Sequence, residues 1–174
     1  DLNYASKFYD SVLHHGVEKF DIILANPPYL RERDNASIFA EINTSEFGKK
    51  YHQGKMDFWY YFMHLSLDLL SNDGLVSFIT SRYWLSGQGA KKLIDRLKSN
   101  AYFVDVVDIG KIKVFNDVVG HHIISTLSIK KKSILRYRVI KNLINEIYDT
   151  ELRIIELKND DVFVNNEIVF NPNK

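Results

Sequence analysis

The sequence predicts an α/β fold with a largely parallel sheet, because short apolar runs alternate with segments of helical periodicity. The runs at residues 20–25 and 75–80 are apolar and end abruptly, which is typical of buried strands. The segments at residues 57–70 and 86–99 carry apolar residues at helical spacing. This order of strand, helix, strand and helix predicts a layer of helices packed against the sheet.

The boundaries of these elements follow from ordinary start and stop signals. Pro27 and Pro28 end the first strand, which we expect to be buried on both faces. Residues 31–55 are polar and predict a long loop, a feature that is usually functional or mobile. Asp57 suits the N-cap of the first helix, and Asn72-Asp73-Gly74 predicts the end of that helix and a turn.

The rest of the chain continues the sheet. Residues 102–109 and 122–129 predict a third and a fourth strand. No helix separates these two strands, so we expect them to pair antiparallel. After Lys132 the pattern weakens. The weaker signals predict two short strands and one short helix, at residues 134–140, 154–157 and 142–148.

Composition excludes several classes of protein. The 174 residues fit one domain, and 45% hydrophobic with 13% aromatic residues can form a packed core. The absence of cysteine excludes disulfide frameworks and thiolate metal sites. No apolar run reaches the roughly 18 residues of a membrane span, and no signal peptide is visible, so we expect a cytoplasmic protein without membrane contact. Because the first residue is Asp1, we also expect that the chain begins within a longer protein.

No constellation of side chains predicts a metal site. The pairs His14-His15 and His121-His122 are adjacent residues, and neighbours in a strand point to opposite faces. For the same reason Asp105 and Asp108, three residues apart in a strand, are not expected to form a catalytic carboxylate pair.

Basic residues gather in one segment of an otherwise balanced chain. Lys and Arg number 23 against 22 for Asp and Glu, yet no acid lies between residues 130 and 141. Such a stripe is a candidate for contact with a phosphate backbone, and the alternative is a solvated strand end and loop. The candidate contacts are Lys130, Lys131, Lys132, Arg136 and Arg138, with Lys141 at the end of the stripe.

The most informative residues are Asn26, Pro27, Pro28 and Tyr29, directly after the first strand. Ligands of an open α/β sheet bind at the carboxyl ends of its strands. Two successive prolines make a stiff shelf, and the Pro27 carbonyl and the Asn26 side-chain oxygen are two acceptors on it. The alternative is a rigid turn that only ends the strand.

Two converging acceptors and an aromatic ring form a receptor for a planar amine. The lone pair of an aromatic amine is delocalised into its ring, so the amine is a poor nucleophile. Acceptors that bind both N–H groups favour a pyramidal nitrogen and stabilise the charge that develops during attack. This chemistry needs no strong base before the methyl group moves.

These residues resemble the catalytic motif of adenine-N6 DNA methyltransferases, which has Asn, Asp or Ser before Pro-Pro and an aromatic residue. Residues 54–60, 73–74, 78–80, 108–110 and 113–115 resemble further segments of the type IIG restriction–modification methyltransferases. The resemblance covers residues 20–132 and implies a partial Rossmann-like S-adenosylmethionine-dependent methyltransferase fold. That part is the second half of the sheet, mostly parallel with an antiparallel last strand.

The resemblance implies roles for single residues. Asn26 and the Pro27 carbonyl would accept hydrogen bonds from the adenine amine. Tyr29 and Phe115 would stack on the base, which must leave the duplex for chemistry. Phe115 is equally an ordinary core aromatic. The partners implied are S-adenosylmethionine and double-stranded DNA, in a bacterial restriction–modification or related defence system.

One departure from the family concerns the cofactor. The Gly-rich loop and the acidic residue that hold S-adenosylmethionine lie upstream of the motif in the family, and only 25 residues precede Asn26. Gly87-Gln88-Gly89 follows the wrong strand to replace that loop. We therefore expect Asn26 to form only the edge of the cofactor site, and the chain to be inactive alone. The open edge of a half sheet could also pair with a second copy.

Several alternatives stay open. Residues 1–132 would be the C-terminal half of the catalytic domain, and residues 133–174 an exit segment toward a target recognition domain. The same shelf occurs in methyltransferases for a protein glutamine or for guanine in ribosomal RNA. A non-catalytic, DNA-contacting module is a further alternative. Lys55 and Asp57 are candidates to line the site of the complete enzyme, although Asp57 is more simply a helix N-cap. Residues 59–62 are more simply core than a stacking platform.

Overall fold

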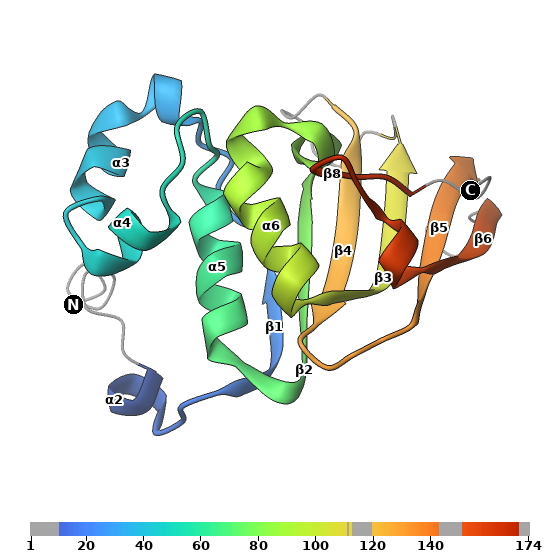
Figure 1. The fold of residues 1–174 in the computed structure, drawn as a ribbon, viewed down its shortest axis with the longest axis horizontal. Coiled ribbons are helices and arrows are strands. Elements are labelled where there is room, and N and C mark those ends of the chain that lie inside the picture. The colour runs from blue at the N-terminus through green and yellow to red at the C-terminus, as the bar shows by residue number, and fades with distance from the viewer. Residues whose placement is uncertain (1–10, 111, 113–119, 143–150, 171–174) are drawn as a thin grey trace.

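A computed structural model describes residues 11–110, 112, 120–142 and 151–170. Its centre is a six-stranded sheet with the order β1-β2-β4-β3-β5-β6, which Figure 1 shows. Helices pack on one face of this sheet. The strands of this sheet are β1 (Phe20–Ala25), β2 (Leu70–Ser81), β3 (Tyr102–Gly110), β4 (His122–Ser128), β5 (Ile134–Asn142) and β6 (Glu151–Lys158). The helices are α2 (Ser11–His15), α3 (Ala36–Ile42), α4 (Glu46–Tyr51), α5 (Trp59–Leu69) and α6 (Lys91–Asn100).

Four strands of the sheet run in one direction. β1 pairs parallel with β2, and β3 pairs parallel with β5, whereas β4 is antiparallel to both β2 and β3. β6 pairs antiparallel with β5. The predicted antiparallel pairing of the segments at 102–109 and 122–129 is therefore confirmed. The two weak strand patterns after Lys132 also form strands, and these extend the same sheet. Apart from residue 142, the short helix expected at 142–148 lies outside the described residues.

The core lies between the sheet and the helices α5 and α6. Trp59 of α5 and Trp84 are fully buried and meet edge to face, with ring centroids 5.4 Å apart. Phe78 of β2 and Phe103 of β3 complete this layer from the sheet side. Of the predicted core segment 59–62, only Phe62 is exposed, so that prediction is mostly confirmed.

The expectation that the first strand is buried on both faces is wrong. Ile22 and Leu24 are 67% and 74% exposed, while Ile23 and Ala25 pack against the core. The reason is that α5 and α6 cover one face of the sheet only (Figure 1). Within the described part of the chain, β1 also has β2 as its single neighbour.

The predicted loop at residues 31–55 contains two short helices, α3 and α4. Phe39 of α3 and Tyr51 of α4 are buried in the core, and the Ser45 hydroxyl accepts a hydrogen bond from the Gly48 amide at 3.0 Å. Helices of seven and six residues depend on such tertiary contacts, and polar composition hides them from a sequence pattern.

Two predicted boundaries are also wrong. α5 begins at Trp59, and Asp57 does not cap it, because its carboxylate accepts a hydrogen bond from Tyr83 instead. Residues 72–74 lie inside β2 rather than in a turn. A bulge separates the pair Phe20–Leu70 from the regular pairing that starts at Ile22–Leu75.

The last described segment returns to the helix-covered face of the sheet. The Asn159 side chain accepts a hydrogen bond from the Phe103 amide and donates one to the Phe103 carbonyl, each at 2.8 Å. After the small hairpin of β7 (Phe163–Val164) and β8 (Glu167–Ile168), Phe170 stacks on Tyr137 with centroids 5.2 Å apart. In the described residues, no helix is long and apolar enough to cross a membrane.

Candidate active site

The segment from Asn26 to Tyr29 lies at the carboxyl edge of the sheet, immediately after β1. Pro27 is buried, Tyr29 is half-buried, and Asn26 and Pro28 are exposed. The Pro27 carbonyl accepts no hydrogen bond from the described residues, so both acceptors of the predicted shelf remain available to a ligand.

Tyr29 is fixed by its hydroxyl, which donates to the Ile79 carbonyl of β2 at 2.7 Å. The same hydroxyl lies 3.2 Å from the Asn26 side-chain oxygen. Because a hydroxyl carries one hydrogen, the shorter contact to Ile79 dominates and leaves lone pairs of the Asn26 oxygen free. Burial, and then the neighbouring Tyr83, raise the Tyr29 pKa to about 12, so this hydroxyl stays protonated at neutral pH.

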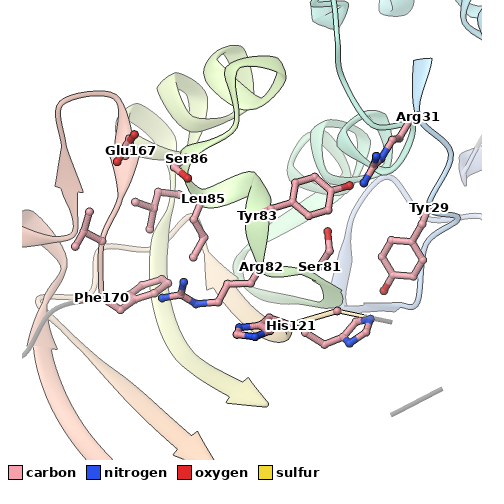
Figure 2. Close-up of a pocket in the computed structure, with 14 residues that line it drawn as sticks. Tyr29, Arg31, Ser81, Arg82, Tyr83, Leu85, Ser86, His121, Glu167 and Phe170 are labelled. Atoms are coloured by element: carbon pink, nitrogen blue, oxygen red, sulfur yellow. The ribbon is translucent and has the colours of Figure 1, made fainter. Parts of the chain in front are cut away.

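A cavity of about 690 Å³ opens beside Tyr29. Figure 2 shows Tyr29, Arg31 and Tyr83 on one side of it, Glu167 and Phe170 on the other, and Arg82 between. Four segments that are distant in sequence therefore form its walls. The lining residues are Tyr29, Arg31, Ser81, Arg82, Tyr83, Leu85, Ser86, Gly120, His121, His122, Glu167, Ile168, Val169 and Phe170.

Asp108 is a buried carboxylate that holds Arg82, one of the residues that line the cavity. The Arg82 Nε donates to Asp108 at 2.9 Å, the Tyr137 hydroxyl donates at 2.8 Å, and the Gly110 amide donates at 2.9 Å. Burial and the contact with Asp108 raise the Tyr137 pKa to about 12. Three donors satisfy the buried charge, so Asp108 holds Arg82 in place.

Asp105 and Asp108 face opposite sides of the sheet, as predicted. Asp105 is paired with Thr126 in the register, and Asp108 with Ile123. Asp105 instead accepts a hydrogen bond from Arg138 Nε at 3.0 Å. The two carboxylates therefore belong to two separate clusters.

The basic stripe is not part of the shelf. Lys130 pairs with Asp73, and Lys131 and Lys132 follow it in the turn between β4 and β5. β4 has seven residues, so this turn lies about 23 Å along the sheet from its carboxyl edge. Arg136 and Arg138 both lie within 4 Å of Asp105, which balances part of their charge. One stretch of DNA would have to span the sheet to meet the shelf and the stripe together.

Lys55 and Asp57 lie behind the cavity wall. Asp57 is buried, and Lys55 is exposed with a left-handed backbone at φ 67°. The Lys55 amide donates to Glu32 at 2.6 Å, and its ammonium lies 3.4 Å from the Gln88 oxygen. Neither residue lines the cavity of this chain, and the hypothesis that they line the site of the complete enzyme stays a prediction.

Gly89 has a packing role. A Cβ atom at this position would lie 2.0 Å from the Lys55 carbonyl oxygen and 2.9 Å from the Met56 amide nitrogen. The glycine therefore allows the start of α6 to contact the segment before α5. This role explains the glycine without any contact to a cofactor.

Two predicted features stay open. Phe115, expected to stack on the base, lies outside the described residues. His121 and His122 both line the cavity, but the described residues contain no group of three or more side chains that could hold a metal ion.

Sequence reasoning missed Arg31, Arg82 and Tyr83. One signal was present, because residues 82–83 directly follow the second parallel strand as residues 26–29 follow the first. The part played by residues 167–170 had no such signal, since it depends on the return of the chain over the sheet.

Comparison with known proteins identifies the family. A model of the Eco57I restriction-modification methylases matches residues 2–115, which is more than half of the 174 residues. The chain belongs to the Eco57I restriction-modification methylase family. The type II methyltransferase M.BstVI of Geobacillus stearothermophilus is 30% identical over 127 residues, covering 68% of this chain and 21% of that protein. The chain spans about a fifth of the length of the curated relatives that it matches.

Solved structures share the fold of this family member. The type IIL restriction-modification enzyme MmeI, solved in complex with DNA, has a TM-score of 0.59 at 14% identity, covering 79% of this chain and 18% of that chain. The methyltransferase subunit of a type I restriction-modification system from Streptococcus thermophilus has a TM-score of 0.55 at 13% identity, covering 79% and 31%. The predicted Rossmann-like fold of S-adenosylmethionine-dependent methyltransferases is thus confirmed.

Proposed function

We propose that the protein containing this chain transfers a methyl group from S-adenosylmethionine to the exocyclic N6 amine of adenine in DNA, within a restriction–modification or related defence system. One observation carries this proposal. The Asn26 and Pro27 oxygens lie at the carboxyl edge of the sheet with acceptor capacity left, since Asn26 receives only the long 3.2 Å contact from Tyr29, and the anchored Tyr29 lines a cavity of about 690 Å³. Membership of the Eco57I family supports DNA as the substrate.

The described residues provide the amine-binding part of the reaction. The Asn26 oxygen and the Pro27 carbonyl would each accept one N–H of the adenine amine and hold its lone pair toward the methyl donor. The N6–methyl bond forms as the sulfur–methyl bond breaks, and the nitrogen then loses one proton to solvent. Tyr29, held by Ile79, would present its ring to the extruded base.

S-adenosylmethionine would supply the methyl group as a sulfonium. Asn26 is exposed directly after β1, one of the two edge strands of the described six-stranded sheet, and this position fits the rim of a cofactor site. The rest of that site would belong to residues outside this chain. We therefore propose that this chain alone binds the cofactor weakly and does not turn over.

Methyl transfer by the full-length protein tests the function directly. The protein would be incubated with labelled S-adenosylmethionine and, separately, with duplex DNA, a release-factor protein and ribosomal RNA. We expect label only in DNA, and only on adenine. Label on a protein glutamine or an RNA guanine would contradict the proposal. Salt-dependent DNA binding without any transfer would indicate the non-catalytic module.

A further inference from the structure

Two arginines at the cavity differ in how their charge is balanced. Arg82 forms an ion pair with Asp108 at 2.9 Å. Arg31 is exposed and forms no salt bridge within the described part of the chain. Asp108 thus balances the charge of Arg82 directly, whereas Tyr83 and, without an ion pair, Asp57 and Asp34 balance only part of the charge of Arg31, which also faces the cavity.

The backbone around Arg31 is fixed relative to the shelf. Arg31 forms an antiparallel β-bridge with Asp57. On either side, the Glu32 amide donates to the Met56 carbonyl at 3.1 Å, and the Phe58 amide donates to the Leu30 carbonyl at 2.8 Å. Arg31 follows Tyr29 by two residues, so these bonds set its position beside the amine-binding acceptors.

The Arg31 side chain is also held. Its guanidinium carbon lies 5.3 Å from the centroid of the Tyr83 ring, a cation–π distance. The Tyr83 hydroxyl in turn donates to Asp57, which is only 4% exposed. Figure 2 shows Arg31 beside Tyr83, with Tyr29 on the same side of the cavity. The guanidinium also interacts with the Tyr83 hydroxyl, and because it carries five N–H donors, donors remain for a further acceptor.

A phosphodiester is the anion that this arrangement fits. A base that enters the cavity stays attached to its sugar, so the phosphates next to it must lie at the opening. A planar guanidinium binds phosphate through two parallel hydrogen bonds. We propose that Arg31 binds a phosphodiester flanking the extruded adenine, with Tyr83 and Asp57 as positioning residues. This inference rests on the proposed function and names its DNA-backbone contact.

Arg33 offers a matched control. It has the same chemistry and lies two residues further along the chain, but it does not line the cavity. Its side chain is 72% exposed and pairs with Asp34 at 3.2 Å. Replacing Arg33 changes the net charge as much as replacing Arg31 does, without touching the stack on Tyr83.

The first experiment measures duplex DNA binding by the full-length protein over a range of salt concentrations. We expect Arg31→Ala to weaken binding about tenfold and to reduce the slope of log affinity against log salt by about one. Arg33→Ala should keep both values within twofold of wild type. Arg31→Lys keeps the charge and loses the planar fork, so its slope should stay while its affinity falls less than that of Arg31→Ala.

A second experiment locates the phosphate that Arg31 contacts, by replacing single phosphates of the DNA with uncharged methylphosphonates. A methylphosphonate on either side of the target adenine should weaken binding by wild type but not by Arg31→Ala, because the two changes remove the same contact. If the methylphosphonates at both positions weaken binding equally in wild type and Arg31→Ala, and wild type still methylates adenine, the inference is wrong and the proposed function stands. A wild type that methylates no adenine would overturn the proposed function and the inference with it.

Discussion

The two ends of the sheet differ in their polar residues: one end has side chains held by hydrogen bonds beside a cavity, and the other has exposed lysines. At the carboxyl end, residues 26–29 and 81–83 carry few charges, but hydrogen bonds hold Tyr29, Arg82 and Tyr83 in place. At the opposite end, the lysines at 130–132 stand in an exposed turn, and Asp73 pairs with the first of them. In the sequence, the density of positive charge indicated the lysine end as a candidate binding site. In the structure, the fixed polar groups beside the cavity indicate the carboxyl end.

Removal of the Asn26 oxygen should produce the largest effect. Asn26→Ala should lower kcat/KM for DNA methylation about 100- to 1000-fold, the usual loss for one preorganised polar group at a reacting centre. Its midpoint of thermal unfolding should not change, since the side chain is exposed. Asn72→Ala, at the opposite end of β2, is the control and should keep full activity. Equal activity of Asn26→Ala and Asn72→Ala would show that the Asn26 oxygen is not needed for methyl transfer.

Gly89 tests the scaffold behind the cavity. Gly89→Ala should lower the free energy of unfolding by about 1–3 kcal/mol or more, because the added methyl meets the Lys55 backbone at 2.0 Å. Gly54→Ala, where nothing lies within 4 Å, should be nearly neutral. Urea titration of both variants measures the difference. Indistinguishable midpoints would show that the contact between residues 55 and 89 does not constrain the fold.

Protonation of a side chain in the helix layer, and not at the carboxyl edge of the sheet, should cause the loss of folding stability at low pH. Burial first, and then Arg96, lower the pKa of His64 from 6.5 to about 3. The unfolded chain therefore takes up this proton first, and stability is lost as pH falls from about 6.5 toward about 3, by up to about 1.4 kcal/mol per pH unit. His64→Gln should flatten that slope in urea titrations. An unchanged slope would assign acid lability to other groups.

The Tyr29 hydroxyl should have a smaller effect. Tyr29→Phe removes its bond to Ile79, so we expect a loss of about 1 kcal/mol in the free energy of unfolding and a several-fold fall in kcat. Tyr102→Phe serves as a matched control away from the shelf. Full activity in Tyr29→Phe, together with full stability, would show that the anchor does not position the ring.

The lysines of the opposite end should matter least. Replacing Lys130, Lys131 and Lys132 together by alanine should change KM for DNA less than threefold at physiological salt, since the turn lies far from the shelf. Arg31→Ala should exceed this effect although it removes one charge instead of three. A larger loss in the triple variant would show that the lysines of the stripe contribute more to DNA binding than Arg31 does.

Much of the fold was predictable because its elements carry strong patterns. The strands at 20–25, 75–80, 102–109 and 122–129 are apolar runs, and their order fixed the antiparallel return of the last one. The two helices at 36–42 and 46–51 were not predictable, because few apolar side chains mark them and Phe39 and Tyr51 stabilise them through tertiary contacts.

The shelf was predictable and the cavity was not. Residues 26–29 form a local motif after a strand, so sequence alone indicates its place. The cavity needs residues 29–31, 81–86 and 120–122 to meet residues 167–170. Their meeting depends on Asn159, which binds the backbone of Phe103 and brings the chain end across the sheet. No local sequence pattern indicates how far, or in which direction, the chain returns across the sheet.

The most direct test of the central claim is nucleoside analysis of DNA treated with the full-length protein and S-adenosylmethionine, for wild type and for Asn26→Ala. We expect N6-methyladenine with wild type, none above background with Asn26→Ala, and equal unfolding midpoints for the two proteins. Methylation of another nucleoside, or the same yield of N6-methyladenine from both proteins, would contradict it.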